Sequence, residues 1–235
     1  MKNLVRFTCG LAVAIFLVAA NASATVIADW TFETTHASVT GVTGTDIGPI
    51  SPESGAGSYT AHHASGAAAW SAPVGQGSAY SSSVTAWASG DYFEFEVSTL
   101  SLTGITVGWD QVGSATGPRD FIFQYSLNNS SYTTFGSAYT VLLNSSPTWT
   151  STASTTKYSY SEDLSSVSAI ENQATVYFRL VNNSSSAING TGNTAAGGTD
   201  RIDNVVVQGI PEPSTIMLLG FGLVGCVLAI RRRRS

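Results

Sequence analysis

The chain has 235 residues, of which 15 are acidic and 10 are basic. Between residues 25 and 210 the balance is sharper, because four basic residues stand against 14 acidic ones, a net charge of −10. An acidic body of this kind argues against nucleic acid as a partner, since binding to the phosphate backbone needs a basic surface. Both cysteines, Cys9 and Cys226, lie outside residues 25–210, so no disulfide can hold that part of the chain together.

The first 24 residues are typical of a secretory signal peptide. Lys2 and Arg6 provide a positive start, Leu11 to Ala20 is an apolar run, and Ala22-Ser23-Ala24 forms an A-x-A cleavage site. This pattern predicts export of the chain and a mature protein that begins at Thr25.

Alternation of apolar and polar residues dominates the body, and no segment there has sustained helical periodicity. We expect strands at 26–33, 91–97, 104–112, 120–127, 174–181 and 201–209. Since each such strand needs one dry face, the alternation predicts a core that contains Phe93, Phe95, Trp109, Phe121, Phe123, Phe178 and Leu180.

Polar turns separate these strands, for example TGPR at 116–119, LNNSS at 127–131 and NSSP at 144–147. Residues 41–89 are rich in Gly, Ala and Ser with weak alternation, so we expect long loops there with one or two short strands. Together these features predict one all-β domain over residues 25–209, an antiparallel β-sandwich of the jelly-roll type.

Two stretches of the body carry a resemblance. The sequences TGPRDFIFQYSLN (116–128) and GGTDRIDNVVVQG (197–209) resemble segments of jelly-roll ectodomains on other secreted bacterial proteins with sorting tags. The resemblance covers two strands with their turns and includes no catalytic signature. Some similar sandwiches bind carbohydrate, so it implies sugar binding as a function to consider.

The tryptophans fall into two groups. Trp30 and Trp109 lie in strand patterns and are expected in the core, whereas the remaining three lie in loop-like surroundings rich in Ser and Thr. An exposed indole ring can stack on the apolar face of a sugar, with neighbouring hydroxyl and amide groups as hydrogen-bond partners. This predicts sugar stacking by Trp70, Trp87 and Trp149, with packing beneath a loop as the alternative.

Two glutamates on one strand face are the best candidates for catalysis. Glu94 and Glu96 lie two residues apart, which places their Cα atoms roughly 7 Å from each other. Paired carboxylates at comparable separation can hydrolyse glycosides. The alternative, which we favour, is that both lie on the wet face of a half-exposed strand.

The chain has three histidines, His36, His62 and His63. Since His62 and His63 are adjacent, a strand would direct them to opposite faces, which makes them a poor pair of metal ligands. We expect all three in solvated loops. The sequence has no G-x-S-x-G, H-E-x-x-H or P-loop motif, and nothing nominates a Ser–His–Asp triad.

Carboxylates on the first and last predicted strands suggest a structural calcium ion. Asp29 lies on the first, and Asp200 and Asp203 lie at the start of the last, beside Asn204. If these strands are neighbours, oxygen ligands from both could hold Ca²⁺. The alternative is that these carboxylates cap backbone amides in turns. No other cofactor is predicted.

The C-terminus combines three features in a fixed order. Pro211-Glu212-Pro213 is followed by an apolar segment, 214–230, and then by the four arginines Arg231, Arg232, Arg233 and Arg234. The segment is long enough to approach the thickness of a bilayer core as a transmembrane helix, and the arginines predict that its far end is cytoplasmic.

This order resembles the PEP-CTERM sorting signal of Gram-negative bacteria. The resemblance covers residues 210–235 and implies a partner, exosortase, a membrane-embedded cysteine transpeptidase that recognises the tripeptide and processes the signal near it. It also implies an association with exopolysaccharide or biofilm. Anchoring in the membrane would then be transient and would precede arrival at the cell surface or in the extracellular matrix.

For the whole chain the sequence favours a non-enzymatic, exported surface or matrix protein whose β-sandwich binds exopolysaccharide. A secreted hydrolase of polysaccharides is one alternative, and a purely structural adhesin is the other.

Overall fold

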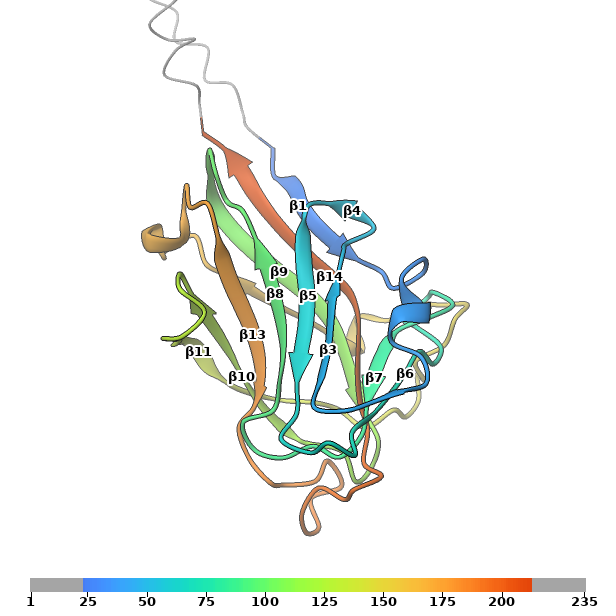
Figure 1. Cartoon of the computed structure of the whole chain (residues 1–235). Coiled ribbons are helices and arrows are strands. Elements are labelled where there is room, and N and C mark those ends of the chain that lie inside the picture. Colours follow the sequence, from blue (N-terminus) through green and yellow to red (C-terminus); the bar gives the residue numbers. More distant parts are fainter. Residues whose placement is uncertain (1–22, 213–235) are drawn as a thin grey trace, which may run out of the picture. The chain divides into compact units, whose positions relative to one another are not determined.

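The computed structural model describes residues 23–212, which form two antiparallel β-sheets packed face to face (Figure 1). The eight-stranded sheet has the order β12-β9-β14-β7-β6-β2, with β1 paired to β14 and β4 paired to β1. The six-stranded sheet has the order β11-β10-β13-β8-β5-β3. The strands are β1 (Thr25–Trp30), β2 (Val42–Thr43), β3 (Asp46–Ile50), β4 (Ser54–Gly55), β5 (Gly57–His62), β6 (Ala69–Ser71), β7 (Ser82–Val84), β8 (Tyr92–Val97), β9 (Leu102–Gly113), β10 (Asp120–Ser126), β11 (Thr133–Thr140), β12 (Ser159–Asp163), β13 (Val176–Asn182) and β14 (Asp200–Pro211).

Helix in the described residues is limited to three 3₁₀ turns of three residues each, His36–Ser38, Thr156–Tyr158 and Ser168–Ile170. The prediction of an all-β, antiparallel architecture is therefore confirmed for residues 23–212. From β8 onward the chain passes repeatedly from one sheet to the other, although the finer jelly-roll assignment stays a prediction.

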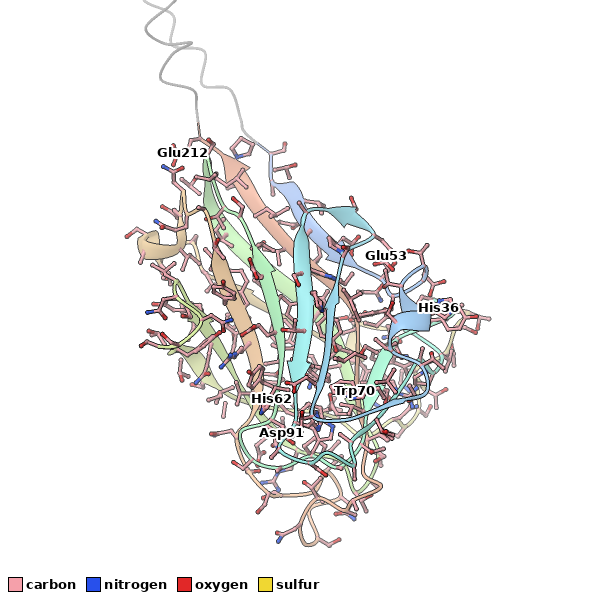
Figure 2. All side chains as sticks on the ribbon, viewed as in Figure 1. His36, Glu53, His62, Trp70, Asp91 and Glu212 are labelled. Carbon is pink, nitrogen blue, oxygen red and sulfur yellow. The ribbon has the colours of Figure 1, made fainter. Side chains whose placement is uncertain are left out.

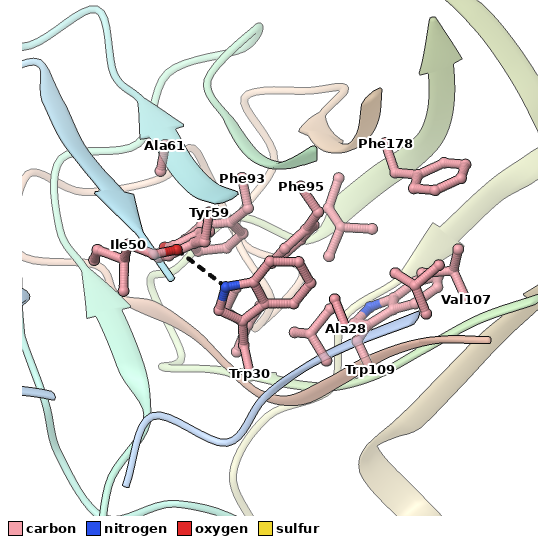
Figure 3. Close-up of a cluster of buried hydrophobic side chains, with 14 of the residues drawn as sticks. Ala28, Trp30, Ile50, Tyr59, Ala61, Phe93, Phe95, Val107, Trp109 and Phe178 are labelled. Carbon is pink, nitrogen blue, oxygen red and sulfur yellow. Dashed lines mark hydrogen bonds between the residues drawn. The ribbon is translucent and has the colours of Figure 1, made fainter. Parts of the chain in front are cut away.

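The core lies between the sheets and is rich in aromatic rings (Figure 3). Trp30 of β1 contacts Phe95 of β8 across the interface, with ring centroids 5.2 Å apart, and its indole N–H donates to the Ile50 carbonyl at 3.1 Å. Trp109 of β9 stacks on Phe123 of β10 at 5.7 Å. All seven residues predicted in the core are buried. The prediction succeeded because successive side chains of a strand point to opposite faces, so alternating apolar residues identify the buried face.

Residues 41–89 contain six short strands, β2 to β7, so the prediction of mainly loops was wrong there. The pattern was hidden because several inward positions carry small or polar residues. Ser82, Ser83 and Val84 of β7 are all buried, and Ser82 is hydrogen-bonded to the buried Tyr59 hydroxyl at 2.9 Å. Hydrophobic periodicity cannot detect a strand whose buried polar groups are satisfied in this way.

The last strand reaches two residues beyond its predicted end. Ile210 pairs with Thr103 of β9 and Pro211 pairs with Leu102, so the folded body continues past residue 209. The Glu212 N–H then donates to the Ser101 carbonyl at 2.9 Å.

Several predictions fall outside the described residues. They are the signal peptide 1–24 apart from its last two residues, Pro213, the transmembrane helix 214–230 and the arginines 231–234. Among residues 23–212, no helix has the length and apolar character that crossing a membrane requires.

Candidate functional site

The three tryptophans predicted to stack on sugars are buried, so that prediction is wrong. Trp70, Trp87 and Trp149 are 2%, 5% and 3% exposed. Their indole N–H groups donate to backbone carbonyls, those of Gly44, Val84 and Val74 respectively. Large apolar rings with a satisfied N–H are stable inside the protein, which is the alternative that the sequence left open.

Trp70 and Trp87 enclose a histidine. The His63 ring is fully buried and meets both indoles edge to face, with centroids 5.1 Å and 4.3 Å away. Its Nδ1 lies 3.3 Å from the Asp91 carboxylate. Burial lowers the pKa of His63 to about 4 in spite of that nearby charge. The expectation of a solvated histidine was therefore wrong at this position.

The other two histidines are partly exposed. His62 lies on the outer side of β5, whereas the adjacent His63 is buried, so the two rings point in opposite directions as their adjacency predicted. The His62 ring is hydrogen-bonded to the Asp46 carboxylate at 2.7 Å. His36 stacks on Tyr80 with centroids 3.6 Å apart. His62, Trp70 and Asp91 lie toward one end of the sandwich, far from Glu212 (Figure 2).

The predicted calcium ligands do not gather. In residues 23–212, no three His, Cys, Asp or Glu side chains come together as a metal site requires. Asp203 instead accepts hydrogen bonds from the Gln76 N–H, the Ser78 hydroxyl and the Asn204 N–H. Burial nevertheless raises its pKa to about 7. Asp203 therefore caps backbone amides, which is the alternative to calcium binding that the sequence left open.

The remaining two carboxylates have separate surroundings. Asp200 is fully buried and accepts from the Gln111 amide at 2.9 Å, and its burial holds the pKa well above the usual range. Asp29 is partly exposed on β1, where burial and then the nearby Glu53 charge raise its pKa. The calcium cluster of Asp29, Asp200 and Asp203 is thus not formed.

The outer face of the six-stranded sheet carries a group of polar and aromatic side chains outside the core. Strand pairing aligns its residues in three rows across β5, β8, β13 and β10. The rows are Ser58–Glu96–Tyr177–Ser126, Thr60–Glu94–Arg179–Gln124 and His62–Tyr92–Val181–Ile122. We call these residues, together with Tyr132 from the β10–β11 turn, the outer face.

An ion pair organises the centre of the outer face. Arg179 Nε donates to Glu94 Oε2 at 2.6 Å, and the two side chains are 16% and 8% exposed. The Tyr132 hydroxyl and the Thr60 hydroxyl also donate to this carboxylate, at 2.6 and 3.3 Å. The guanidinium lies between the rings of Tyr92 and Tyr132, 3.7 Å from each centroid. The pair is thus both hydrogen-bonded and shielded by aromatic surface.

Three tyrosines, Tyr92, Tyr132 and Tyr177, contribute the aromatic rings of the outer face. Burial raises the pKa of Tyr92 and of Tyr132, and Tyr132 gains further from its hydrogen bond to Glu94. Burial and the neighbouring Glu96 charge raise the pKa of Tyr177 as well. All three phenols therefore stay protonated at neutral pH and can donate hydrogen bonds. Neutral rings with a hydroxyl donor are suited to contact with polar, uncharged ligands.

The two glutamates differ in a way that their spacing did not suggest. Glu96 is exposed as expected, whereas Glu94 is buried because Arg179 and Tyr132 cover it. Alternation in the sequence placed Glu94 and Glu96 on one face of their strand, and the same alternation in residues 176–181 directs Tyr177 and Arg179 to one face of β13. What it could not provide was the register that makes these strands neighbours, or the approach of Tyr132 from a turn.

The C-terminal segment has a match among known families. Residues 209–234 match the model of the PEP-CTERM protein-sorting motif. The chain carries a PEP-CTERM sorting motif. This motif marks an exported protein sorted to the cell surface, and it implies processing by exosortase. The expected resemblance is therefore confirmed, and its first residues lie within the described β14.

None of the curated proteins compared with this chain matches it. Solved structures give loose likenesses to the body. TmCBM61 in complex with β-1,4-galactotriose is 12% identical with a TM-score of 0.30, over 55% of this chain and 70% of the other. The N-terminal cellulose-binding domain of Cellulomonas fimi β-1,4-glucanase C is 12% identical with a TM-score of 0.29, over 57% and 86%. The K3 cleaved adhesin domain of Lys-gingipain from Porphyromonas gingivalis is 13% identical with a TM-score of 0.29, over 62% and 80%.

Proposed function

We propose that this protein is exported, held briefly in the membrane by residues 214–230, processed by exosortase, and delivered to the cell surface or extracellular matrix. The sorting motif at 209–234 supports this proposal, together with the signal-peptide pattern of residues 1–24. The four terminal arginines would stay in the cytoplasm until the tail is removed. The released body would carry a net charge of −10.

Mass spectrometry of the mature protein tests the sorting half of the proposal. In a host that has the processing enzyme, we expect a C-terminus near Pro213, because the segment beyond it serves only to stop transfer. Surface copies that retain Arg231–Ser235 in the majority would contradict this. Deleting Arg231–Arg234 provides the control, since it should impair arrest in the membrane without changing the body.

We further propose that the body is non-enzymatic and binds exopolysaccharide through the outer face. Tyr177 and Tyr92 offer partly exposed rings for the apolar faces of sugars, while the Glu96 carboxylate and the Gln124 amide offer hydrogen bonds. The observation that supports this most is the fixed geometry of the centre, where Glu94 holds Arg179 between two rings. A site held in place in advance loses little entropy on binding.

The charge of the body favours uncharged glycans. A surface that carries the exposed Glu96, with Asp46 beside His62 at its edge, on a body of −10, repels polyanionic polysaccharides at low salt. We therefore expect retention on neutral chains in preference to uronic-acid polymers.

The hydrolase alternative has less support. Three donors occupy the Glu94 carboxylate, so it has no proton-transfer role without breaking the ion pair. A release of reducing ends from the host polysaccharide by the purified body would favour the hydrolase. The structural adhesin is favoured instead if no glycan is retained at all.

Replacing Tyr177 or Tyr92 with alanine should weaken retention on the host's neutral exopolysaccharide by about three- to tenfold each, since one ring contact is worth about 1 kcal/mol. Affinity electrophoresis with the purified body measures this. Tyr80→Ala is the matched control, because Tyr80 stacks on His36 away from the outer face. Equal retention by all three variants would contradict the assignment of this face.

A further inference from the structure

The folded body and the sorting motif share residues. The match begins at residue 209, whereas β14 continues to Pro211. Ile210 and Pro211 lie opposite Thr103 and Leu102 of β9, and the Glu212 N–H donates to the Ser101 carbonyl at 2.9 Å. Two residues of the PEP tripeptide are therefore held by the sheet, with no linker between strand and motif.

The proline of this pairing does not weaken it. Pro211 has no N–H, but it lies opposite Leu102 at a position of the antiparallel ladder where the two paired residues exchange no hydrogen bonds. The next N–H, that of Glu212, makes the hydrogen bond to the neighbouring strand end. The Thr103 hydroxyl also donates to the Ile210 carbonyl at 3.4 Å. The end of β14 is thus an ordinary strand terminus, which frays at small cost.

A membrane-embedded protease must surround the segment that it cuts. Proteases and peptide receptors bind an extended segment through its backbone groups, and β9 already occupies one edge of residues 210–212. Only Pro213, at most about 4 Å of chain, separates Glu212 from the apolar segment 214–230. This is too short to fill an active-site cleft on both sides of a cut near Pro213.

We infer that the end of β14 is a clamp on the sorting motif, and that processing requires Ile210–Glu212 to detach from Ser101–Thr103. This inference rests on the proposed processing by exosortase. The rate of processing then follows the population of the frayed end and not the global stability of the sandwich.

A disulfide across the clamp tests the inference. Thr103→Cys with Ile210→Cys joins residues directly opposite each other, at a Cα separation of about 5.5 Å or less that a disulfide can span, and leaves the PEP tripeptide intact. The body has no cysteine, and Cys9 lies in the signal peptide. Cys226→Ser in every variant therefore removes the remaining native cysteine. Thr106→Cys with Gln208→Cys is the matched control, because it locks the same two strands upstream of the motif.

In membranes that contain the processing enzyme, the oxidised 103–210 variant should be processed at least about tenfold more slowly than the parent, and a reductant should restore the rate. The 106–208 variant should keep the parent's rate. A Gly/Ser spacer of about eight residues after Ile210, which reaches roughly 25 Å when extended, should restore processing of the locked chain.

The outcomes are distinct. If the parent chain is not processed, the proposed sorting fails before the clamp is tested. If the parent is processed and the oxidised 103–210 variant is processed at the same rate, the clamp is disproved, and the enzyme binds residues 210–212 while they remain paired with β9. A locked chain that stays unprocessed even with the spacer would also overturn the inference, since the disulfide would then act elsewhere.

Discussion

Replacing Arg179 with methionine is expected to lower the free energy of unfolding by about 3 kcal/mol. The change preserves most of the apolar stem but leaves the carboxylate of Glu94, a side chain only 8% exposed, without its cation. A buried charge that loses its partner retains its desolvation penalty, and two hydroxyl donors compensate for it only in part. Contacts of the guanidinium with the rings of Tyr92 and Tyr132 are lost as well.

Urea unfolding of the purified body measures the effect, and a double-mutant cycle identifies its source. Glu94→Gln combined with Arg179→Met should be more stable than the sum of the single changes predicts, by about 2 kcal/mol, because both charges are removed together. Arg119→Met is the matched control, since its ion pair with Asp120 lies on the surface and its loss should change little. Additive single effects would contradict the pairing.

Alternation predicted much of the fold because it records burial residue by residue. In β8 and β13, Phe93, Phe95, Phe178 and Leu180 are inward and their neighbours outward, as the pattern required. The same logic fails in residues 41–89, where β7 turns serines inward. A strand whose buried groups are satisfied by partners such as Tyr59 has no apolar signature to detect.

The candidate site was harder to predict than the fold, because it depends on contacts distant in sequence. Glu94 and Arg179 are 85 residues apart, and only the register of β8 with β13 makes them neighbours. The tryptophans failed for a related reason. The Ser- and Thr-rich neighbours of Trp70 and Trp87 in the sequence are not their neighbours in space, where both rings pack around His63.

That buried histidine leads to the second large effect, a loss of stability in acid. His63 has a folded-state pKa of about 4, whereas an unfolded histidine titrates near 6.5. Between pH 6.5 and pH 4 the histidine is protonated in the unfolded chain but neutral in the folded one. The contribution of this residue to stability is therefore complete above pH 6.5 and is lost as the pH falls toward 4. The difference corresponds to about 3 kcal/mol.

Other groups act in the opposite direction and would mask this loss in the parent protein. Asp203 has a folded-state pKa of about 7, above its unfolded value, so its proton stabilises the fold as the pH falls from 7 toward 4. Comparison with a variant that lacks the histidine isolates the single contribution. His63→Phe keeps an aromatic ring between Trp70 and Trp87, and the polar contact that it removes is the approach of Nδ1 to the Asp91 carboxylate at 3.3 Å.

We therefore expect the stability of His63→Phe relative to the parent to rise by about 3 kcal/mol between pH 6.5 and pH 4, and to stay constant above pH 7. Chemical unfolding at a series of pH values measures it, and any offset that the larger ring causes at neutral pH cancels in the difference. The titratable groups that face His63 are Asp91 and, farther away, His62 and Asp46. Of these only Asp91 is buried, and its attraction for an imidazolium opposes the loss. A difference that is flat from pH 7 to pH 4 would mean that Asp91 compensates fully and that His63 is protonated inside the fold as readily as in water.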